Sequence, residues 1–600
     1  MKKINIKTLT VLAAASLALT SCDDLFEPAI ENNLGVDYMY KNAQYAEGVL
    51  GNAYTRIPCA SFPFNEVATD DAVSNDTGND WRKIAGGSWT ADNNPTERWR
   101  NCRAAIMYIN MFLARADKVH WVNDEIASKM FCDREKGEAY GMRAMFMYYL
   151  LQAHGGVTAD GQLMGVPIIT DEEDVNSEHN LPRNTFADCM KAIYDDCQKA
   201  IDLLPSEYKQ IATDAEIPAK YKEIGASVGQ YNRVFGRIFK GRVDATIVQA
   251  FRSKAALLAA SPAFQASGAK YEDAANYAAE VLDKIGGVAG MDPTGWTWYC
   301  NTKEINNLTE GACPAEILWR GERSENNDWE SDNFAPTLEG KGRINPTQNF
   351  VDAFPMANGM PITEEGSGYD ANDPYANRDP RLAAYVLYNG GTEGVANTVI
   401  NTEQNSTTND GINKLSGKST RTGYYLRKLL RQDVNLDPTK PTKQFHYTPR
   451  IRYTELFLNY AEAANEAWGP TGKGSHNYSA YDVIKALHNR AGVGNEYLES
   501  IKTNKEKMRE LIRNERRIEL SFEGFRFWDL RRWNLVDAMT ADVKGMSIVS
   551  SEKDGKTTYT YNVVPVESRG YKDYMIYGPI PFSEILKFDQ LSQNKGWETK

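Results

Sequence analysis

Apolar side chains recur every three or four positions along several long segments, which is the spacing of one face of an α-helix. One such helix is expected to begin within Asn94 to Glu97, where Asn can cap, Pro can take the first position and Glu the first turn. A second is expected from about Glu135 to Ala153, and a third from Thr185, with Asp188 in the capping-box position. The N-terminal half of the chain is therefore predicted to be largely helical.

Further helices are expected in pairs, at 246–260 with 271–285 and at 453–468 with 481–491. Paired amphipathic helices favour stacked hairpins of the tetratricopeptide kind, although no strict repeat consensus is visible. Between about residues 286 and 445 Gly, Asn, Pro and Asp dominate, and strand-like runs are short. The pattern predicts a mostly α fold with a loop-rich, mixed α/β excursion, and loops on a rigid scaffold commonly carry binding sites.

The densest charge lies in Asn514 to Trp533, NERRIELSFEGFRFWDLRRW. Arg516 and Glu519 are three residues apart, so they share a helix face and can pair. The arginines could form a site for anions, or a buried ion-pair lattice that fixes the C-terminal helix to the body. We favour the lattice, because arginine–carboxylate forks fix geometry well even where their net stabilisation is small. The apolar stripe of this helix is expected to be Met508, Leu511, Ile512, Ile518 and Phe522.

The N-terminus has the pattern of a lipoprotein leader. Three lysines precede the apolar run Leu9 to Leu19, which is too short to span a bilayer, and the run ends in Leu19-Thr20-Ser21-Cys22. This is similar to a lipobox, so residues 1–21 are predicted to be a signal peptide and Cys22 the lipidated residue. The alternative is an ordinary secretory signal with a chance cysteine. Two or three acyl chains would anchor the protein stably.

Composition favours a globular protein that meets the membrane only through this anchor. Beyond Cys22 no apolar run is long enough to cross a bilayer, and 42% of residues are hydrophobic. We expect one domain over 22–600, with a helical part to about 285, the excursion over 286–445 and a second helical part over 446–600. The net charge of −12 argues against nucleic acid as a partner.

Signals for catalysis or metal binding are weak. The eight cysteines are scattered without a CxxC pair and the six histidines are dispersed, so no zinc site and no cofactor are predicted. A structural calcium ion is left open in the Asp/Asn-rich loop 369–379, whose spacing fits no EF-hand. The run 225–229 contains the letters of the G-x-S-x-G motif. No strong strand precedes it, so it is not expected to form the strand–turn–helix that holds a nucleophilic serine. We predict no enzyme, and no catalytic residues are assigned.

Aromatic residues beside polar ones in loops are the candidate ligand site. Sugars present apolar C–H faces and hydroxyl groups, which flat aromatic rings flanked by Asn, Asp, Gln or Arg can meet. The alternative is that each Trp packs under its own loop, because Trp is mostly buried. Trp468, Trp528 and Trp533 sit in helical motifs and are expected in the core. The predicted ligand-binding residues are Trp81, Arg82, Trp89, Trp296, Trp298, Tyr299, Asn327 and Trp329.

Several motifs, in order along the chain, resemble those of the SusD/RagB family of outer-membrane nutrient-binding lipoproteins. The block 514–533 is similar to the family's C-terminal motif. The other matching runs are EAYGMRAMFMYYLLQAHGGV with GVPIIT, LPRNTFADCMKAIYDDCQKAIDLLP, NPTQNFVDAFPMANG, YTELFLNYAEAANEA with ALHNRAGVG, and YGPIPFSEILKFDQLSQNKGW. Together they span nearly the whole chain after the leader.

The resemblance implies a SusD-like fold and a surface lipoprotein that captures a glycan. It further implies delivery to a TonB-dependent, SusC-like transporter, and a location on the outer membrane facing the cell exterior. In such proteins aromatics from the N-terminal loops and from the mid-chain excursion converge on one exposed face. The alternatives are a peptide or glycopeptide ligand as in the RagB branch, a surface glycosidase with two carboxylic acids in a cleft, and a scaffold subunit without ligand.

Overall fold

The computed structural model describes residues 35–58 and 61–598, so the predicted leader and Cys22 lie outside the described residues. The first half is built from helices, as the apolar spacing predicts. Asp124, Thr185 and Asp244 each cap a helix, because each side chain accepts a hydrogen bond from a backbone N–H three residues ahead. The helices are α2 (Ala43–Tyr54), α3 (Trp81–Ala85), α4 (Trp99–Leu113), α5 (Glu125–His154), α6 (Phe186–Leu203), α7 (Ala219–Lys222), α8 (Val228–Phe235), α9 (Ala245–Ala260) and α10 (Tyr271–Leu282).

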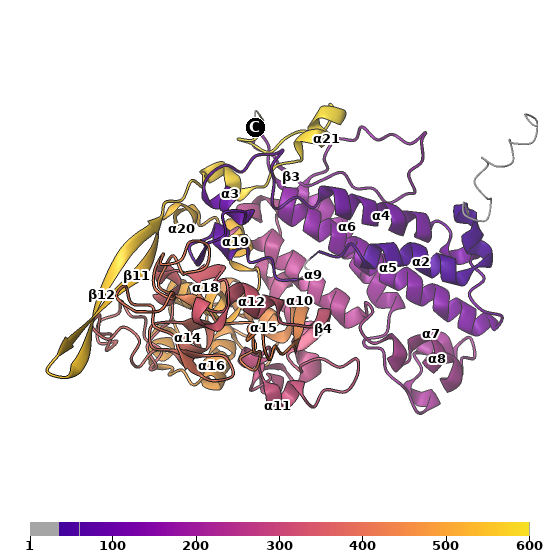
Figure 1. The fold of residues 1–600 in the computed structure, drawn as a ribbon. Coiled ribbons are helices and arrows are strands. Elements are labelled where there is room, and N and C mark those ends of the chain that lie inside the picture. Colours follow the sequence, from indigo (N-terminus) through magenta and orange to yellow (C-terminus); the bar gives the residue numbers. More distant parts are fainter. Residues whose placement is uncertain (1–34, 59–60, 599–600) are drawn as a thin grey trace, which may run out of the picture.

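The long helices pack as consecutive pairs, which confirms the mostly α, tetratricopeptide-like scaffold. Helix α5 packs on α6, α9 on α10, and α10 on α15 of the C-terminal part. In Figure 1 helices α2, α4, α5 and α6 lie side by side at one end of the molecule, and α9, α10 and α15 continue the stack. Alanines such as Ala259 and Ala278 are fully buried between the helices, so the axes approach closely.

The C-terminal helices complete the largest apolar core. Leu150 of α5 and Leu456 of α15 belong to one buried cluster, although about 300 residues separate them in the chain. The predicted pair at 453–468 and 481–491 is confirmed almost to the residue. These helices are α15 (Tyr453–Trp468), α16 (Ala480–Ala491), α17 (Glu496–Ile501), α18 (Lys505–Glu519), α19 (Arg526–Arg532), α20 (Val536–Thr540) and α21 (Phe582–Lys587).

The excursion contains short helices and small antiparallel sheets, as predicted. Strand β1 pairs with β5, which ties the N-terminal loops to the excursion, and β4 pairs with β10. The helices are α11 (Thr302–Ile305), α12 (Asp328–Asn333), α13 (Gln348–Val351) and α14 (Pro380–Tyr385). The strand pairs are β1 (Ala72–Ser74) with β5 (Ile344–Pro346), β4 (Ile317–Asn326) with β10 (Gln444–Arg452), β6 (Val386–Leu387) with β9 (Tyr425–Leu426), β7 (Thr392–Glu393) with β8 (Thr398–Val399), and β2 (Gly156–Val157) with β3 (Leu163–Met164) in the N-terminal part.

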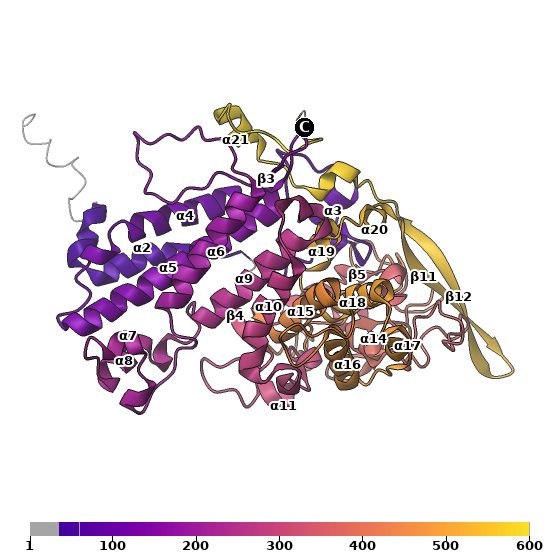
Figure 2. The ribbon, with the colours of Figure 1, turned by 180° about the vertical axis from the view of Figure 1, so that it is seen from behind.

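A long hairpin near the C-terminus was not predicted. Strands β11 (Val543–Lys553) and β12 (Lys556–Glu567) pair in register around Asp554 and Gly555, whose φ angles of 53° and 70° are those of a type I′ turn. Both views show the hairpin reaching away from the body at the end opposite α2 (Figures 1 and 2).

Two predicted helix starts are wrong. Helix α4 begins at Trp99 rather than within Asn94 to Glu97, because the Asn94 side chain accepts hydrogen bonds from Thr96 and from the Trp89 indole instead of capping a helix. Helix α5 begins already at Glu125, where Asp124 caps it. Its first turns carry Ile126, Met130 and Phe131 at helical spacing, so the sequence contained a signal that the prediction did not use. Among the described residues, no helix combines the length and apolarity needed to cross a bilayer.

Candidate functional site

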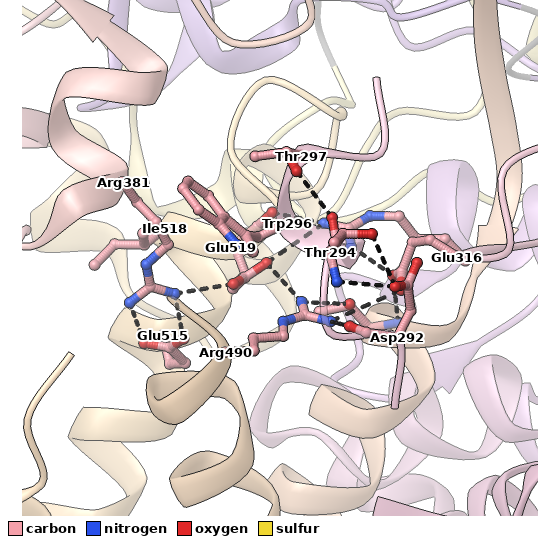
Figure 3. A network of polar contacts seen from close by, with 12 residues as sticks. Asp292, Thr294, Trp296, Thr297, Glu316, Arg381, Arg490, Glu515, Ile518 and Glu519 are labelled. Atoms are coloured by element: carbon pink, nitrogen blue, oxygen red, sulfur yellow. Dashed lines mark hydrogen bonds and ion pairs between the residues drawn. The ribbon is translucent and has the colours of Figure 1, made fainter. Parts of the chain in front are cut away.

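A buried network of ion pairs lies at the centre of the C-terminal part (Figure 3). The guanidinium group of Arg381 donates hydrogen bonds to Glu519 Oε1 at 3.0 Å and to Glu515 Oε2 at 3.1 Å. Arg490 binds Glu519 Oε2 at 3.1 Å, and its other amino nitrogen lies 3.8 Å from Glu316. The side chains of all five residues are at most 4% exposed. Helices α14, α16 and α18 and the start of β4 are thereby joined.

This network and its neighbours confirm the predicted lattice, with one correction. Arg516 and Glu519 do not form the predicted pair: Arg516 bonds Asp529 at 2.6 Å, whereas Glu519 accepts from Arg381 and Arg490. Burial alone would raise the pKa of Glu519, but the adjacent guanidinium groups lower it. The ion-pair partners of Arg516 and Glu519 come from other elements and not from α18 itself, because other helices pack against α18 on several sides.

The network also fixes the loop that carries Trp296. Arg490 donates to the carbonyl oxygen of Asp292 at 3.3 Å, and the Tyr385 hydroxyl donates to that of Trp296 at 2.9 Å. A Cβ atom at Gly295 would overlap the Glu316 carboxylate and the Arg490 guanidinium, so a larger residue there would displace these ends of the ion-pair network. Figure 3 shows this loop folded over the ion pairs.

A second set of ion pairs joins the C-terminal helices to the N-terminal loops. Arg517 and Arg526 bind Asp70 at 2.8 and 2.9 Å, and Arg517 also binds Asp71. Burial alone would raise the pKa of Asp70, but the two guanidinium groups lower it to about 2. The loop between α2 and α3 is therefore held against α18 and α19.

The predicted aromatic residues fall into two groups. In the first, Trp81 and Trp89 pack on Phe527 with ring centroids 5.6 and 6.4 Å away. Trp81 is half-buried. Trp89 is 1% exposed, and its indole N–H donates to Asn94 Oδ1 at 2.8 Å. In this structure Trp89 therefore offers no ring face to a ligand.

The second group surrounds Phe62. Its ring centroid lies 5.3 Å from that of Trp329 and 6.5 Å from that of Trp298. Trp298 and Tyr299 are 1% and 5% exposed, whereas Trp329 and Trp296 are half-buried. The structure thus brings Trp298 and Trp329 of the excursion to an N-terminal loop residue. Trp81 packs against the apolar clusters of both groups.

The predicted polar residues are engaged with nearby backbone. Arg82 donates to the carbonyl oxygen of Asp76 at 3.2 Å and lies 4.0 Å from Glu567. Asn327 donates to the carbonyl oxygen of Thr442 at 3.1 Å. Both remain partly exposed. The assignment of these eight residues to a ligand site stays a prediction.

A groove of about 410 Å³ lies beside Trp81, lined by residues of α3, of the start of α4 and of the turn before α19. We call it the Trp81 groove. It combines two half-buried indoles with amide, carboxylate and guanidinium groups, which is the chemistry that suits a sugar. Its main lining side chains are Asn65, Trp81, Glu97, Arg98, Asn101 and Trp528.

Two residues that adjoin the lining of the Trp81 groove in the chain have unusual backbone. Phe64 precedes Asn65 and Phe522 precedes Glu523, and their φ angles of 49° and 61° are rare for bulky residues. Asn65 donates to the carbonyl oxygen of Gly524 at 3.2 Å, and Gly524 N–H donates to the Glu66 carboxylate at 2.9 Å. Strained backbone persists where surrounding contacts over-determine it and is concentrated at functional sites. These hydrogen bonds hold residues 64–66 and 522–524 together along the groove.

Sequence reasoning identified only Trp81 among these six side chains and missed the other five. Trp528 was expected in the core because its motif is helical, and it is half-buried at the groove instead. Arg98 and Asn101 stand beside Trp99, whose buried ring marks the start of α4. The signal used was an aromatic residue beside polar ones in a loop, whereas Asn101 and Trp528 lie within helices and Arg98 directly precedes one, so this signal could not find them.

The described residues offer little for catalysis or metal binding. Ser227 of the G-x-S-x-G run caps α8 in a capping box with Gln230. The six cysteines within the described ranges form no disulfide there, and three of them are buried. No group of three or more His, Cys, Asp or Glu that could hold a metal ion occurs in that part of the chain. A calcium ion bound through the 369–379 loop stays a prediction.

Two family models match the chain: "SusD family" over residues 315–597 and "Starch-binding associating with outer membrane" over residues 27–224. A solved SusD-like protein from Bacteroides fragilis is 22% identical, with a TM-score of 0.69 over 95% of this chain and 100% of that one. A SusD-like carbohydrate binding protein from the same species is 20% identical, with a TM-score of 0.63 over 92% and 99%. The surface glycan-binding protein A from Bacteroides fluxus is 16% identical, with a TM-score of 0.56 over 93% and 100%. Among curated proteins none matches. At these identities the solved structures show a shared fold.

Proposed function

The chain belongs to the SusD/RagB family, and from this premise we propose that it captures a glycan at the outer membrane and passes it to a TonB-dependent, SusC-like transporter. Two of the structurally similar proteins are described as carbohydrate- or glycan-binding, which supports the ligand class. The proposal also includes a lipid anchor at Cys22 and a position that faces the cell exterior. The protein acts by binding and release, without a chemical step.

The Trp81 groove is the observation that carries this proposal. Trp81 and Trp528 supply aromatic surface, and Asn65, Asn101 and Glu97 supply acceptors and donors for hydroxyl groups. Pockets for small ligands combine a largely apolar wall with a few placed polar groups. The groove fits one or two sugar units of a longer chain, because its volume is within the range of small-ligand sites.

Calorimetry and affinity gels with the purified full-length protein and a polysaccharide panel would test the proposal, with sugar release assayed in the same tubes. We expect saturable binding without product. Trp81→Ala should lower the affinity at least tenfold, since stacking on an indole and its buried area are both lost. Trp468→Ala is the matched control, because Trp468 is also half-buried but lies in α15 outside the groove.

Three results would contradict the proposal in different ways. Released sugar would make the protein an enzyme. Binding to peptides and to no glycan would favour the RagB-like alternative. Glycan binding that survives Trp81→Ala but is lost in Trp329→Ala would move the site to the aromatic group around Phe62.

A further inference from the structure

A second hollow adjoins the Trp81 groove at the start of α4. It measures about 560 Å³, which is within the range of small-ligand sites, and α21 forms one of its walls. We call it the Phe582 hollow, because the ring of Phe582 is 40% exposed there. Its other main lining side chains are Asp92, Glu97, Arg100, Arg103 and Lys587.

The groove and the Phe582 hollow lie on two faces of the same helical segment. Successive residues of an α-helix are turned by about 100°, so residues three or four positions apart share a face. Glu97, just before α4, lines both hollows and is exposed, and so are Arg100 and Asn101 beside it. A chain in the groove can therefore pass over these polar side chains into the Phe582 hollow. The groove face carries Arg98, Asn101 and Cys102, and the other face carries Trp99, Arg100 and Arg103.

One buried histidine fixes the wall of the groove to the segment that leads into α21. The Arg98 backbone N–H donates to His154 Nε2 at 3.2 Å, and His154 Nδ1 lies 2.7 Å from the carbonyl oxygen of Pro579. Since Nε2 accepts, Nδ1 donates, and the imidazole is neutral. Burial lowers the pKa of His154 to about 3, which keeps it neutral at neutral pH. The Phe582 N–H also donates to the carbonyl oxygen of Ala91 at 3.3 Å, so the two hollows keep a fixed arrangement.

Two cations of the Phe582 hollow are already engaged within the protein. Lys587 pairs with Glu584 at 2.7 Å, and Arg103 lies 3.6 Å from Glu173. Their charges are compensated by these carboxylates. We therefore assign them to the wall of the hollow and not to a ligand.

The exposed side chains of the Phe582 hollow resemble those of the groove. Phe582, Arg100 and Asp92 are exposed and take no part in the ion pairs just described. An aromatic ring can meet the apolar C–H face of a sugar, while a guanidinium donates to its hydroxyl groups and a carboxylate accepts from them. The Trp81 groove offers the same combination, with an indole as the ring. Similar groups are thus presented at two neighbouring places.

We infer that the ligand is an extended chain: its units occupy the Trp81 groove, cross the start of α4 at Glu97 and continue in the Phe582 hollow. The inference rests on the proposed function and narrows its ligand to an oligosaccharide of about three or four units or more. Units joined in one chain meet the second hollow at a high effective concentration, so each filled hollow adds to the affinity. The affinity should rise with chain length until both hollows are filled and then level off.

Calorimetry with fragments of defined length would test this on the full-length protein. The probes are disaccharides and hexasaccharides separated by size from starch, cellulose, xylan, mannan and galactan. For a glycan that binds, we expect the hexasaccharide to bind at least about tenfold more tightly than the disaccharide. In Phe582→Ala most of this advantage should be lost, while the disaccharide affinity stays within about twofold, because the groove is intact. Trp81→Ala should weaken the binding of both.

Leu586→Ala is the matched control, because Leu586 lies on the same helix and is 71% exposed, but lines neither hollow. Phe582→Tyr keeps a ring and should retain the hexasaccharide advantage, and a thermal unfolding scan verifies that each variant is folded. Equal affinity for the two lengths, or a hexasaccharide advantage that survives Phe582→Ala, would overturn the inference alone. The absence of binding to all of these glycans would overturn the proposed function as well.

Discussion

The buried network around Arg381 and the Trp81 groove use the same residue types in opposite ways. In the network, Arg381 and Arg490 meet Glu515 and Glu519 with every partner buried, and helices from three parts of the chain are fixed together. In the groove, charged and aromatic side chains stay half-buried or exposed around a hollow.

The comparison of these two regions shows that a high density of charged residues in the sequence does not by itself identify a binding site. The block Asn514 to Trp533 is the most charged part of the sequence, yet most of its charges are satisfied within the protein. The groove lies where this block meets the N-terminal loops, so the lattice holds the wall of the groove in place. Substitutions in the network should therefore change mainly the free energy of unfolding, whereas substitutions in the groove should change mainly the affinity for the ligand.

Removing Arg381 should have the largest effect. Arg381→Met leaves Asp379, Glu515 and Glu519 as buried carboxylates without their shared cation. We expect a loss of about 3–5 kcal/mol in the free energy of unfolding, measured by urea titration, because an uncompensated buried charge is costly. Lys191→Ala, which breaks an exposed pair with Asp195, should cost less than about 1 kcal/mol.

A loss for Arg381→Met as small as that for Lys191→Ala would contradict the contrast between the two regions. It would mean that water or a rearranged helix compensates the three carboxylates.

Glu66 should make stability depend on pH. It is fully buried beneath the groove, and burial raises its pKa to about 7 from an ordinary value of 4.5. The folded state holds the proton that the unfolded state releases above pH 4.5. The stabilisation is therefore complete below pH 4.5 and is lost as pH rises to about 7, at about 1.4 kcal/mol per pH unit or about 3 kcal/mol in all.

Glu66→Gln removes this titration and retains an oxygen that can accept the Gly524 N–H. The difference in unfolding free energy between wild type and variant, from urea titrations at pH 5 and pH 7.5, isolates Glu66 from other titrating groups. We expect the wild type to lose more stability than the variant between the two values. An identical difference at both pH values would show that Glu66 is ionised in the folded protein.

Much of the fold could be predicted from local signals. The cap at Thr185 and the helix pair at 453–468 and 481–491 lie where apolar spacing and capping residues place them. The hairpin around Asp554 and Gly555 was missed although Asp-Gly is a strong hairpin signal, because β12 is largely exposed and neither strand shows a clear alternation of burial.

The site was less predictable, because distant segments assemble it. Trp81 was identified from its loop, but its neighbour Trp528 comes from more than 400 residues further along the chain. Arg516 was expected to bind Glu519 on its own helix and binds Asp529 instead. Spacing reveals neighbours within one helix, whereas partners supplied by other elements require the tertiary structure.

The smallest predicted effect is at the rim of the groove and has a definite sign. Glu97 is exposed there, and its carboxylate accepts the Arg100 N–H at 2.8 Å, which glutamine can also do. Glu97→Gln should leave stability within about 0.5 kcal/mol. It should lower the affinity for a bound glycan about two- to fivefold, because hydrogen bonds from sugar hydroxyl groups to a carboxylate are stronger than those to a neutral amide. Calorimetry would measure this, with Trp468→Ala as the control outside the groove. An unchanged affinity would show that the Glu97 carboxylate does not bind sugar hydroxyl groups, and recognition in the groove would then depend on Trp81 and Trp528.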